Sequence, residues 1–265
     1  MKQLDARILS NRCISGKYYL LRLSASGIAR LSQPGQFIHL RCSESLSPLL
    51  RRPFSIHRVS GAKIDIFYQV VGKGTEILSK KKAGQYLDVI GPLGRGFEID
   101  RPGDFVLVAG GMGIAPLLML AQRLSRCRVN KVILVGAKTK SLILCKEEFK
   151  RLGFKIKAAT EDGSLGFKGL VTDLLEQTLR IKHSSAALRT GSAQCNTNLY
   201  VCGPQEMLKK TARISSKYRL KAQGSLERNM ACGVGACLGC VIKTTHGYRK
   251  VCQDGPVFNL DEIIW

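Results

Sequence analysis

The chain has 265 residues, 45% of them hydrophobic, which is long for one compact domain and sufficient for two with an appendage. Its formal net charge of +23 attracts anionic nucleotides, acidic proteins, nucleic acid or anionic lipid. The basic residues are spread out, without a basic tail or interleaved aromatics, so we expect no nucleic-acid role. No apolar stretch reaches the length of a membrane span and the N-terminus lacks the apolar part of a secretory signal, so we expect no membrane span and a cytoplasmic location.

The first 100 residues alternate short apolar runs with Gly, Pro and Ser, and no helical period separates the runs. This rhythm predicts an antiparallel β-barrel over residues 1–100. The strands are expected at Tyr18–Ala25, Gln36–Cys42, Pro53–Val59, Lys63–Val71 and Tyr86–Ile90. A short helix is expected after Gly72–Thr75.

From Asp104 onward strands and helices alternate, which predicts an α/β domain with a parallel sheet over residues 101–225. Strands are expected at Phe105–Ala109, Lys131–Val135, Lys155–Thr160 and Asn198–Cys202. Helices are expected at Ile114–Ser125, Lys146–Leu152, Val171–Leu179 and Gln205–Tyr218. His183–Asn198 is rich in Ser, Ala, Thr and Asn, and this composition predicts a mobile loop or insertion.

Four of the ten cysteines fall in the last segment, residues 226–265, which is too small for a hydrophobic core of its own. Their pattern is Cys232-x4-Cys237-x2-Cys240-x11-Cys252. Plant-type 2Fe–2S clusters are held by C-x4-C-x2-C and a distant fourth cysteine, and the glycines between these cysteines let the backbone approach the sulfides. A structural zinc site normally uses two close cysteine pairs. We therefore predict a 2Fe–2S domain, with a zinc site or four unrelated thiols as alternatives.

The glycine-rich segment Gly110–Pro116 lies between an expected strand and an expected helix. Glycines at such a position let the backbone close on a pyrophosphate, where free N–H groups and the helix dipole favour anions. The segment is not the G-x-G-x-x-G fingerprint, because Pro116 stands in place of the third glycine. A tight structural turn therefore explains it as well as a nucleotide site does.

Three further segments are candidate contacts, each with a plain structural alternative. Cys202–Pro204 ends an expected strand and begins a helix, where open α/β sheets bind ligands, although an ordinary turn with a buried thiol fits too. Arg52–Ser55 offers a guanidinium for a phosphate and a hydroxyl for a ring nitrogen, although most single arginines are merely solvated. Gly72–Thr75 places backbone N–H groups at a helix start, which suits a second phosphate or an ordinary turn.

Taken in this order, the segments resemble the ferredoxin–NADP⁺ reductase superfamily across essentially the whole chain. The matching strings are Arg52–Ser55, Tyr68–Thr75, Gly91–Gly94, Gly110–Pro116 and Cys202–Pro204. With a cluster segment behind them, the chain looks most like the electron-transfer subunits of NAD-dependent (class 1B) dihydroorotate dehydrogenases, which serve pyrimidine biosynthesis. That resemblance implies an oxidoreductase subunit with FAD, NAD and a 2Fe–2S cluster as cofactors.

The resemblance also implies a role for each matched residue. The FAD contacts would be Arg52, Pro53, Phe54, Ser55, Tyr68, Gln69, Val70, Gly74 and Thr75. The contacts to the nicotinamide nucleotide would be Gly111, Gly113, Cys202, Gly203 and Pro204. The cluster ligands would be Cys232, Cys237, Cys240 and Cys252. The protein's contribution in such a relay is positioning, so no acid–base catalytic residue is assigned.

The resemblance implies a relay between NADH, FAD, the cluster and the FMN of a separate catalytic subunit, in an expected heterotetramer of two of each chain. The small subunit of an NADH-dependent ferredoxin:NADP⁺ oxidoreductase, or of a sulfhydrogenase, has the same parts and is an alternative. A second alternative is a redox-sensing, nucleic-acid-binding module that uses the cluster as its signal. NAD versus NADP stays open, because Lys138 and Lys140 follow the second strand and suit a 2′-phosphate, while the resemblance favours NAD.

Overall fold

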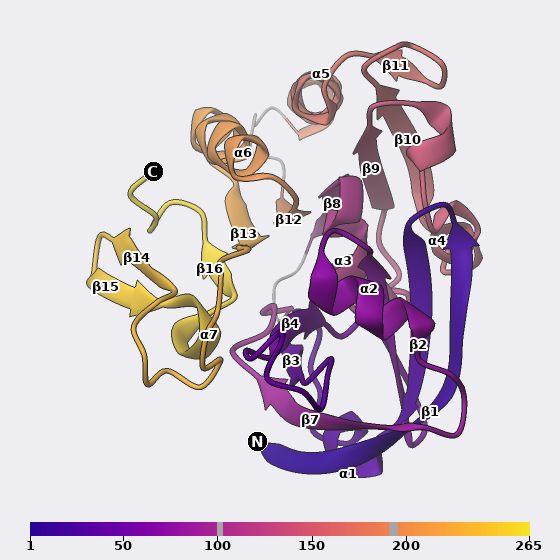
Figure 1. The fold of residues 1–265 in the computed structure, drawn as a ribbon. Helices are drawn as coiled ribbons and strands as arrows, with labels where there is room; N and C mark the ends of the chain where they lie inside the picture. Colours follow the sequence, from indigo (N-terminus) through magenta and orange to yellow (C-terminus); the bar gives the residue numbers. More distant parts are fainter. Residues whose placement is uncertain (100–102, 191–195) are drawn as a thin grey trace.

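The computed structural model describes residues 1–99, 103–190 and 196–265 (Figure 1). Within these ranges, the strands form two seven-stranded sheets and one two-stranded sheet. The first large sheet comes from the N-terminal part of the chain and curves round on itself, and the second stands beside it with helices on both faces (Figure 1). The predicted fold class, an antiparallel barrel followed by a parallel α/β sheet and a cysteine segment, is confirmed.

The curved antiparallel sheet has the strand order β4-β3-β7-β1-β2-β6-β5. Its elements are β1 (Lys2–Ser15), β2 (Tyr18–Ser24), α1 (Ser26–Ala29), β3 (Phe37–Leu40), β4 (Arg52–Ser55), β5 (Arg58–Ser60), β6 (Lys63–Gln69), α2 (Lys73–Lys80) and β7 (Tyr86–Leu93). Side chains alternate across a strand, so Leu21 and Leu23 of β2 enter the interior together with Ile64 and Ile66 of β6. The long strand β1 was not predicted, because most of its side chains are exposed or half-buried and its apolar alternation is weak.

The second sheet has the order β11-β10-β9-β8-β12-β13-β16, parallel throughout except for the last pair. Its strands are β8 (Asp104–Gly110), β9 (Lys131–Ala137), β10 (Lys155–Thr160), β11 (Phe167–Lys168), β12 (Thr197–Cys202), β13 (Lys221–Ser225) and β16 (Val257–Asn259). Its helices are α3 (Ile114–Leu124), α4 (Lys146–Arg151), α5 (Val171–Thr190) and α6 (Gln205–Lys217), with 3₁₀ turns at Gly111–Gly113 and Lys140–Leu142. Leu107 packs with α3 and α4, whereas Val106 and Val108 pack with α5 and α6, because both faces of a parallel sheet are covered.

The prediction of a loop over His183–Asn198 was wrong at both of its ends. Helix α5 runs on to Thr190, because Ala186, Ala187, Leu188 and Arg189 are strong helix formers. At the other end, strand β12 begins at Thr197. Residues 191–195 of that expected loop lie outside the described residues.

The cysteine segment leaves the parallel sheet after β13 and returns to it as β16 (Figure 1). It contains β14 (Val241–Thr244), β15 (Gly247–Lys250) and α7 (Val251–Asp254). Its buried residues Ile242 and Val251 belong to the same apolar cluster as the sheet residues of β8 and β12. The segment therefore shares the core of the parallel sheet instead of building one of its own.

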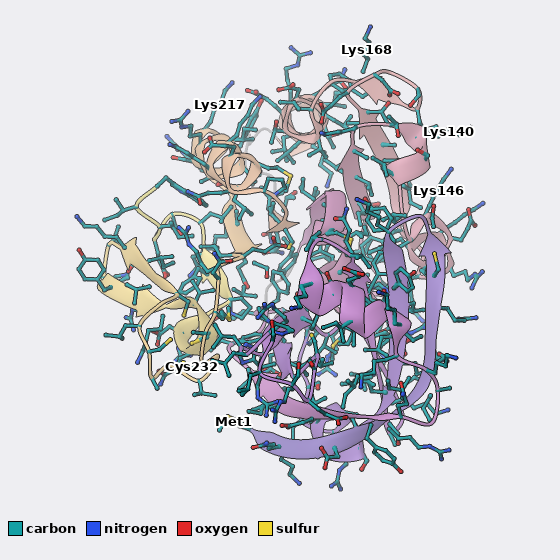
Figure 2. The ribbon with its side chains drawn as sticks, in the orientation of Figure 1. Met1, Lys140, Lys146, Lys168, Lys217 and Cys232 are labelled. Carbon is teal, nitrogen blue, oxygen red and sulfur yellow. The ribbon has the colours of Figure 1, made fainter. Side chains whose placement is uncertain are left out.

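The positive charge is dispersed over the outside of the molecule. Lys140, Lys146, Lys168 and Lys217 are exposed and extend from the periphery of the ribbon (Figure 2). In the part of the chain that the structure describes, no helix combines the length and apolar character needed to cross a membrane.

Candidate functional site

A cavity of about 840 Å³ lies where the curved sheet, the parallel sheet and the cysteine segment meet. We call it the central cavity. Its lining includes Arg52–Ser55 of β4, Phe67–Gln69 of β6, Met112, Ala115 and Pro116 around the glycine turn, Cys202 of β12, Leu226–Met230, and Gly239 of the cysteine segment. Ligand sites typically have volumes of about 300–1,000 Å³, so the cavity is of cofactor size.

One end of the central cavity carries positive charge. The guanidinium of Arg52 lies over Gly74, where an added Cβ would be 3.4 Å from Nε. Thr75 accepts the backbone N–H groups of Val71 at 2.9 Å and Gly72 at 3.1 Å, which fixes the start of helix α2. A guanidinium beside a helix N-terminus suits a phosphate, because both favour anions. Arg52 and Thr75 both line the cavity, and together they fit the pyrophosphate of a dinucleotide cofactor.

The aromatic wall of the same cavity is built on β4 and β6. The Tyr68 hydroxyl donates to Asn11 Oδ1 at 3.1 Å, and its ring meets Phe54 edge-on with centroids 5.7 Å apart. Burial raises the pKa of Tyr68, so its phenol stays neutral. Of the residues proposed from the sequence for this wall, Val70 and Gly74 do not line the cavity, whereas Val71 does.

A second cavity of about 760 Å³ lies at the carboxyl ends of the parallel strands, and we call it the strand-end cavity. Gln69 lines both cavities, so the two adjoin. The lining includes Gly111 and Pro204, two of the residues expected to contact the nicotinamide nucleotide, and the charged residues Lys138, Glu161, Glu206, Lys209, Lys210 and Arg213. Lys140 does not line it. A cationic cavity at strand ends beside a glycine turn fits an anionic dinucleotide.

The remaining predicted nucleotide contacts serve mainly to let strands and helices approach. A Cβ on Gly113 would overlap the carbonyl of Cys202, and one on Gly203 would lie 3.0 Å from the sulfur of Met207. Neither glycine lines the central or the strand-end cavity, whereas Cys202 lines the central one. Burial raises the pKa of the Cys202 thiol, so it is not a reactive thiolate.

Backbone N–H groups point at the sulfurs of three of the four predicted cluster cysteines, Cys232, Cys240 and Cys252. Gly235 N–H donates to Cys252 Sγ at 3.1 Å, Cys237 N–H to Cys232 Sγ at 3.4 Å, and Cys252 N–H to Cys240 Sγ at 3.4 Å. Although burial opposes it, N–H groups around the sulfur lower the pKa of Cys232 to about 6. Such donors stabilise the thiolate form, which binds iron, although burial and the neighbouring Cys240 raise the pKa of Cys252 to about 12.

The loop that carries these thiols turns sharply at its glycines. Gly233 and Gly235 adopt φ values of +71° and +87°, a conformation that glycine reaches without strain. Among the described residues, no group of three or more His, Cys, Asp or Glu side chains is arranged to hold a metal ion. A 2Fe–2S cluster instead spreads its four thiolates over two irons, two to each. The donor set and the loop fit that cluster.

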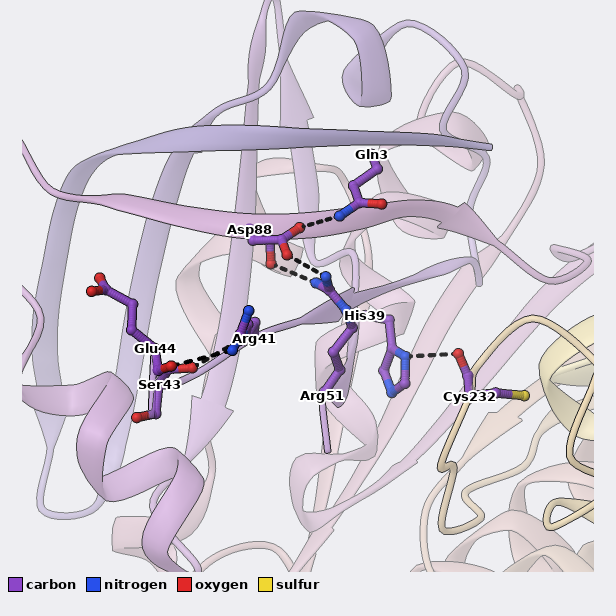
Figure 3. A network of polar contacts seen from close by, with 8 residues as sticks. All are labelled: Gln3, His39, Arg41, Ser43, Glu44, Arg51, Asp88 and Cys232. Carbon is purple, nitrogen blue, oxygen red and sulfur yellow. Dashed lines mark hydrogen bonds and ion pairs between the residues drawn. The ribbon is translucent and has the colours of Figure 1, made fainter. Parts of the chain in front are cut away.

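Sequence reasoning missed His39 of β3, which contacts the cysteine loop from the curved sheet (Figure 3). Its side chain is fully buried, and Nδ1 donates to the carbonyl of Cys232 at 3.2 Å. Burial lowers the pKa of His39, which favours the neutral imidazole. The two residues are 193 positions apart, and no local pattern could have paired them. Asn229 and Met230 in the central cavity were also missed, since nothing in their spacing marks them.

Two family models match this chain. Residues 107–213 match the oxidoreductase NAD-binding domain, and residues 227–264 match the iron–sulfur cluster binding domain of dihydroorotate dehydrogenase B. The first match contains the glycine turn and the Cys202–Pro204 segment, and the second contains all four cluster cysteines.

Solved structures share the fold. An NADH-dependent reduced ferredoxin-NADP oxidoreductase superposes with a TM-score of 0.83 at 28% identity, over 98% of this chain and 90% of that one. A ferredoxin NADP⁺ reductase of Neisseria gonorrhoeae with bound FAD and NADP superposes with a TM-score of 0.67 at 18% identity, over 87% and 96%. The second similarity concerns the fold alone.

Curated relatives match over the full length. The chain is 40% identical to the dihydroorotate dehydrogenase B (NAD(+)), electron transfer subunit, of Desulforamulus reducens, over 100% of this chain and 99% of that protein. It is 38% identical to the subunit of the same name from Geobacillus thermodenitrificans, over 97% and 96%. The chain therefore belongs to the family of dihydroorotate dehydrogenase B electron transfer subunits.

Proposed function

We propose that this chain is the electron-transfer subunit of an NAD-linked dihydroorotate dehydrogenase in pyrimidine biosynthesis. It would pass electrons between NAD(H), FAD and a 2Fe–2S cluster. The observation that carries this proposal is the central cavity, whose wall is shared by the curved sheet, the nucleotide-binding turn and Gly239 of the cysteine loop. A flavin held there touches both the nucleotide side and the cluster side of the molecule.

The chain's own residues supply the binding. Arg52 and the N-terminus of α2 would hold the FAD pyrophosphate, with Ser55 facing the flavin ring. Gly111, Pro204 and the cations of the strand-end cavity would hold the dinucleotide, with Cys202 at its border with the flavin. The chemistry supplied by the bound groups is the conversion of a two-electron hydride into single electrons. No side chain is required to move a proton in this exchange.

The cluster ligands would be Cys232, Cys237, Cys240 and Cys252. Cys237 and Leu238 are exposed, with Leu238 63% accessible, so this edge of the loop stands at the surface. An exposed edge next to the cluster suits electron exchange with a partner chain. We propose that this partner is an FMN-containing catalytic subunit, in a cytoplasmic heterotetramer of two of each chain.

We also propose three structural units: residues 1–100 for FAD, 101–225 for NAD and 226–265 for the cluster. The central cavity then lies where the three units meet. This division keeps each cofactor's main contacts within one stretch of sequence.

The test is reconstitution of the chain with FAD and iron–sulfur, followed by addition of a dihydroorotate dehydrogenase catalytic subunit. We expect a stable complex and dihydroorotate-dependent reduction of NAD⁺. The absence of both a complex and any rate gain would refute the proposed partner. The NADH-dependent ferredoxin:NADP⁺ oxidoreductase, favoured by the 0.83 TM-score, is the second candidate, and ferredoxin-dependent turnover without dihydroorotate would indicate it.

A further inference from the structure

The side chain of His39, on the curved sheet, forms a hydrogen bond to the start of the cysteine loop. His39 is 0% exposed, and its Nδ1 lies 3.2 Å from the carbonyl of Cys232 (Figure 3). Because a carbonyl only accepts hydrogen bonds, the imidazole must donate from Nδ1. In the described part of the chain, Nε2 is buried without a hydrogen-bond partner. The Nδ1 bond thus ties a fully buried ring to a predicted cluster ligand, and the backbone of Met230 lies beside the same ring.

The loop packs on this ring as well as bonding to it. Gly233 has φ +71°, and a Cβ there would lie 2.5 Å from His39 Nδ1 and 3.0 Å from Cε1. Only a glycine lets the loop backbone sit this close to the imidazole. The contact thus depends on both partners, a histidine on the sheet and a glycine on the loop.

His39 lies on a strand that is hydrogen-bonded to a neighbour on each side. Strand β3 is flanked by β4 and β7, and His39 is in register with Pro53 and Ile90. On β7, Asp88 pairs with Arg51 and accepts a hydrogen bond from Gln3 at 3.0 Å (Figure 3). A side chain on a strand with neighbours on both sides is held more precisely than one on a loop.

We propose that His39 is a positioning residue for electron transfer: it fixes the Met230–Gly233 turn on the curved sheet and thereby sets the separation between the central cavity and the first cluster thiolate. Met230 lines the cavity and Cys232 lies two residues further on, so the bond to Cys232 holds the chain two residues from the cavity wall. The inference rests on the proposed function. Because electron transfer slows steeply with distance, a displaced turn slows the step to the cluster and leaves the hydride step unaffected.

The test compares His39→Leu with His39→Asn in the chain loaded with FAD and cluster. Asparagine keeps a donor near the position of Nδ1, and leucine has a similar shape without a donor. In anaerobic stopped-flow with NADH, we expect His39→Leu to slow cluster reduction about tenfold or more while flavin reduction changes less than about twofold. His39→Asn is expected to recover most of the loss, and His246→Leu, in the exposed turn between β14 and β15, to behave as the unmodified chain.

A second readout does not depend on turnover. Hydrogen exchange at the amides of Gly233 and Gly235 is expected to rise about tenfold in His39→Leu and to return towards normal in His39→Asn. If the leucine variant does not keep its cluster, His39→Gln replaces it, because glutamine moves the donor towards the position of Nε2. Equal cluster-reduction rates and equal exchange in the paired variants would overturn the proposal.

Gly233→Ala gives an independent check from the loop side. The added methyl group pushes against the imidazole, so this variant is expected to slow cluster reduction as His39→Leu does, and the double variant to be little slower than either. Full additivity of the two effects contradicts a shared contact. Failure of NADH to reduce the flavin in the unmodified chain would instead refute the proposed function, and the two failures are therefore distinguishable.

Discussion

His57 makes a direct test of the packing between the curved sheet and helix α3. The residue follows β4 and is 3% exposed. Its Nδ1 donates to the carbonyl of Ala115 at 2.8 Å, and its ring lies 5.4 Å from that of Phe67. Burial lowers the pKa of His57 from its ordinary 6.5 to about 4, and the bond to Ala115 only partly opposes this. Lowering the pH to protonate this ring should therefore destabilise the packing between the curved sheet and helix α3.

The sign and size of the change in the free energy of unfolding follow from the difference in proton binding between the folded and unfolded chain. The folded chain binds a proton at His57 less readily than the unfolded chain, so this contribution to stability is complete above pH 6.5 and is lost as the pH falls to about 4. A difference of about 2.5 pKa units, at about 1.36 kcal/mol each, corresponds to about 3 kcal/mol in full. Between pH 7 and pH 5, the expected loss is about 2 kcal/mol.

Urea unfolding at pH 7 and pH 5 measures this loss. His57→Asn keeps a donor for Ala115 but has no ring to protonate, so it is expected to lose about 2 kcal/mol less than the unmodified chain over this interval. His246→Asn, in an exposed turn, serves as the control and is expected to follow the unmodified chain. If His57→Asn and the unmodified chain lost the same free energy of unfolding, the reasoning would be wrong.

Cys237→Ser is expected to abolish electron delivery to the catalytic subunit while NADH still reduces the flavin, as followed by flavin absorbance; delivery at full rate would contradict the relay order. Arg52→Ala is expected to weaken FAD binding about ten- to hundredfold, since a charged hydrogen bond contributes about 1.5–3 kcal/mol. Fluorescence titration measures this affinity. An unchanged affinity would show that Arg52 does not bind the pyrophosphate. Asp65→Asn removes the 2%-exposed carboxylate that Arg22 and Arg58 bind. Because both arginines are about one-third exposed, we expect the free energy of unfolding in urea to fall by about 2 kcal/mol. An unchanged free energy of unfolding would show that these two ion pairs do not stabilise the fold.

Local patterns predicted what depends on local sequence. The buried run at Phe105–Ala109 and the spacing of the four cysteines needed no knowledge of distant residues. Strand β1 was missed because its exposed side chains hide the alternation on which strand prediction relies. The stretch Pro53–Val59, which was predicted as one strand, belongs to two strands, since β4 ends at Ser55 and β5 begins at Arg58.

The site was predictable only where a short motif marks it. The segments of β4, the glycine turn and β12 do meet around the two adjoining cavities, as their order in the chain suggested. The bond from His39 to Cys232 was not predictable, because it joins residues that only the tertiary fold brings together. The cations Lys209 and Arg213 look like ordinary solvated residues of α6 until the helix is placed beside the strand ends.

The pairing of β16 with β13 makes the cysteine segment an insertion that begins and ends at one edge of the parallel sheet. Ser225 and Val257 are paired in register, so the two ends of residues 226–256 meet at one edge of the sheet. An excursion whose ends already touch can be removed, replaced or inserted without rethreading the strands around it. An ancestral reductase could thus gain an electron outlet through one insertion at a sheet edge, and a designer could transplant this outlet between the same two neighbouring strands of a related scaffold.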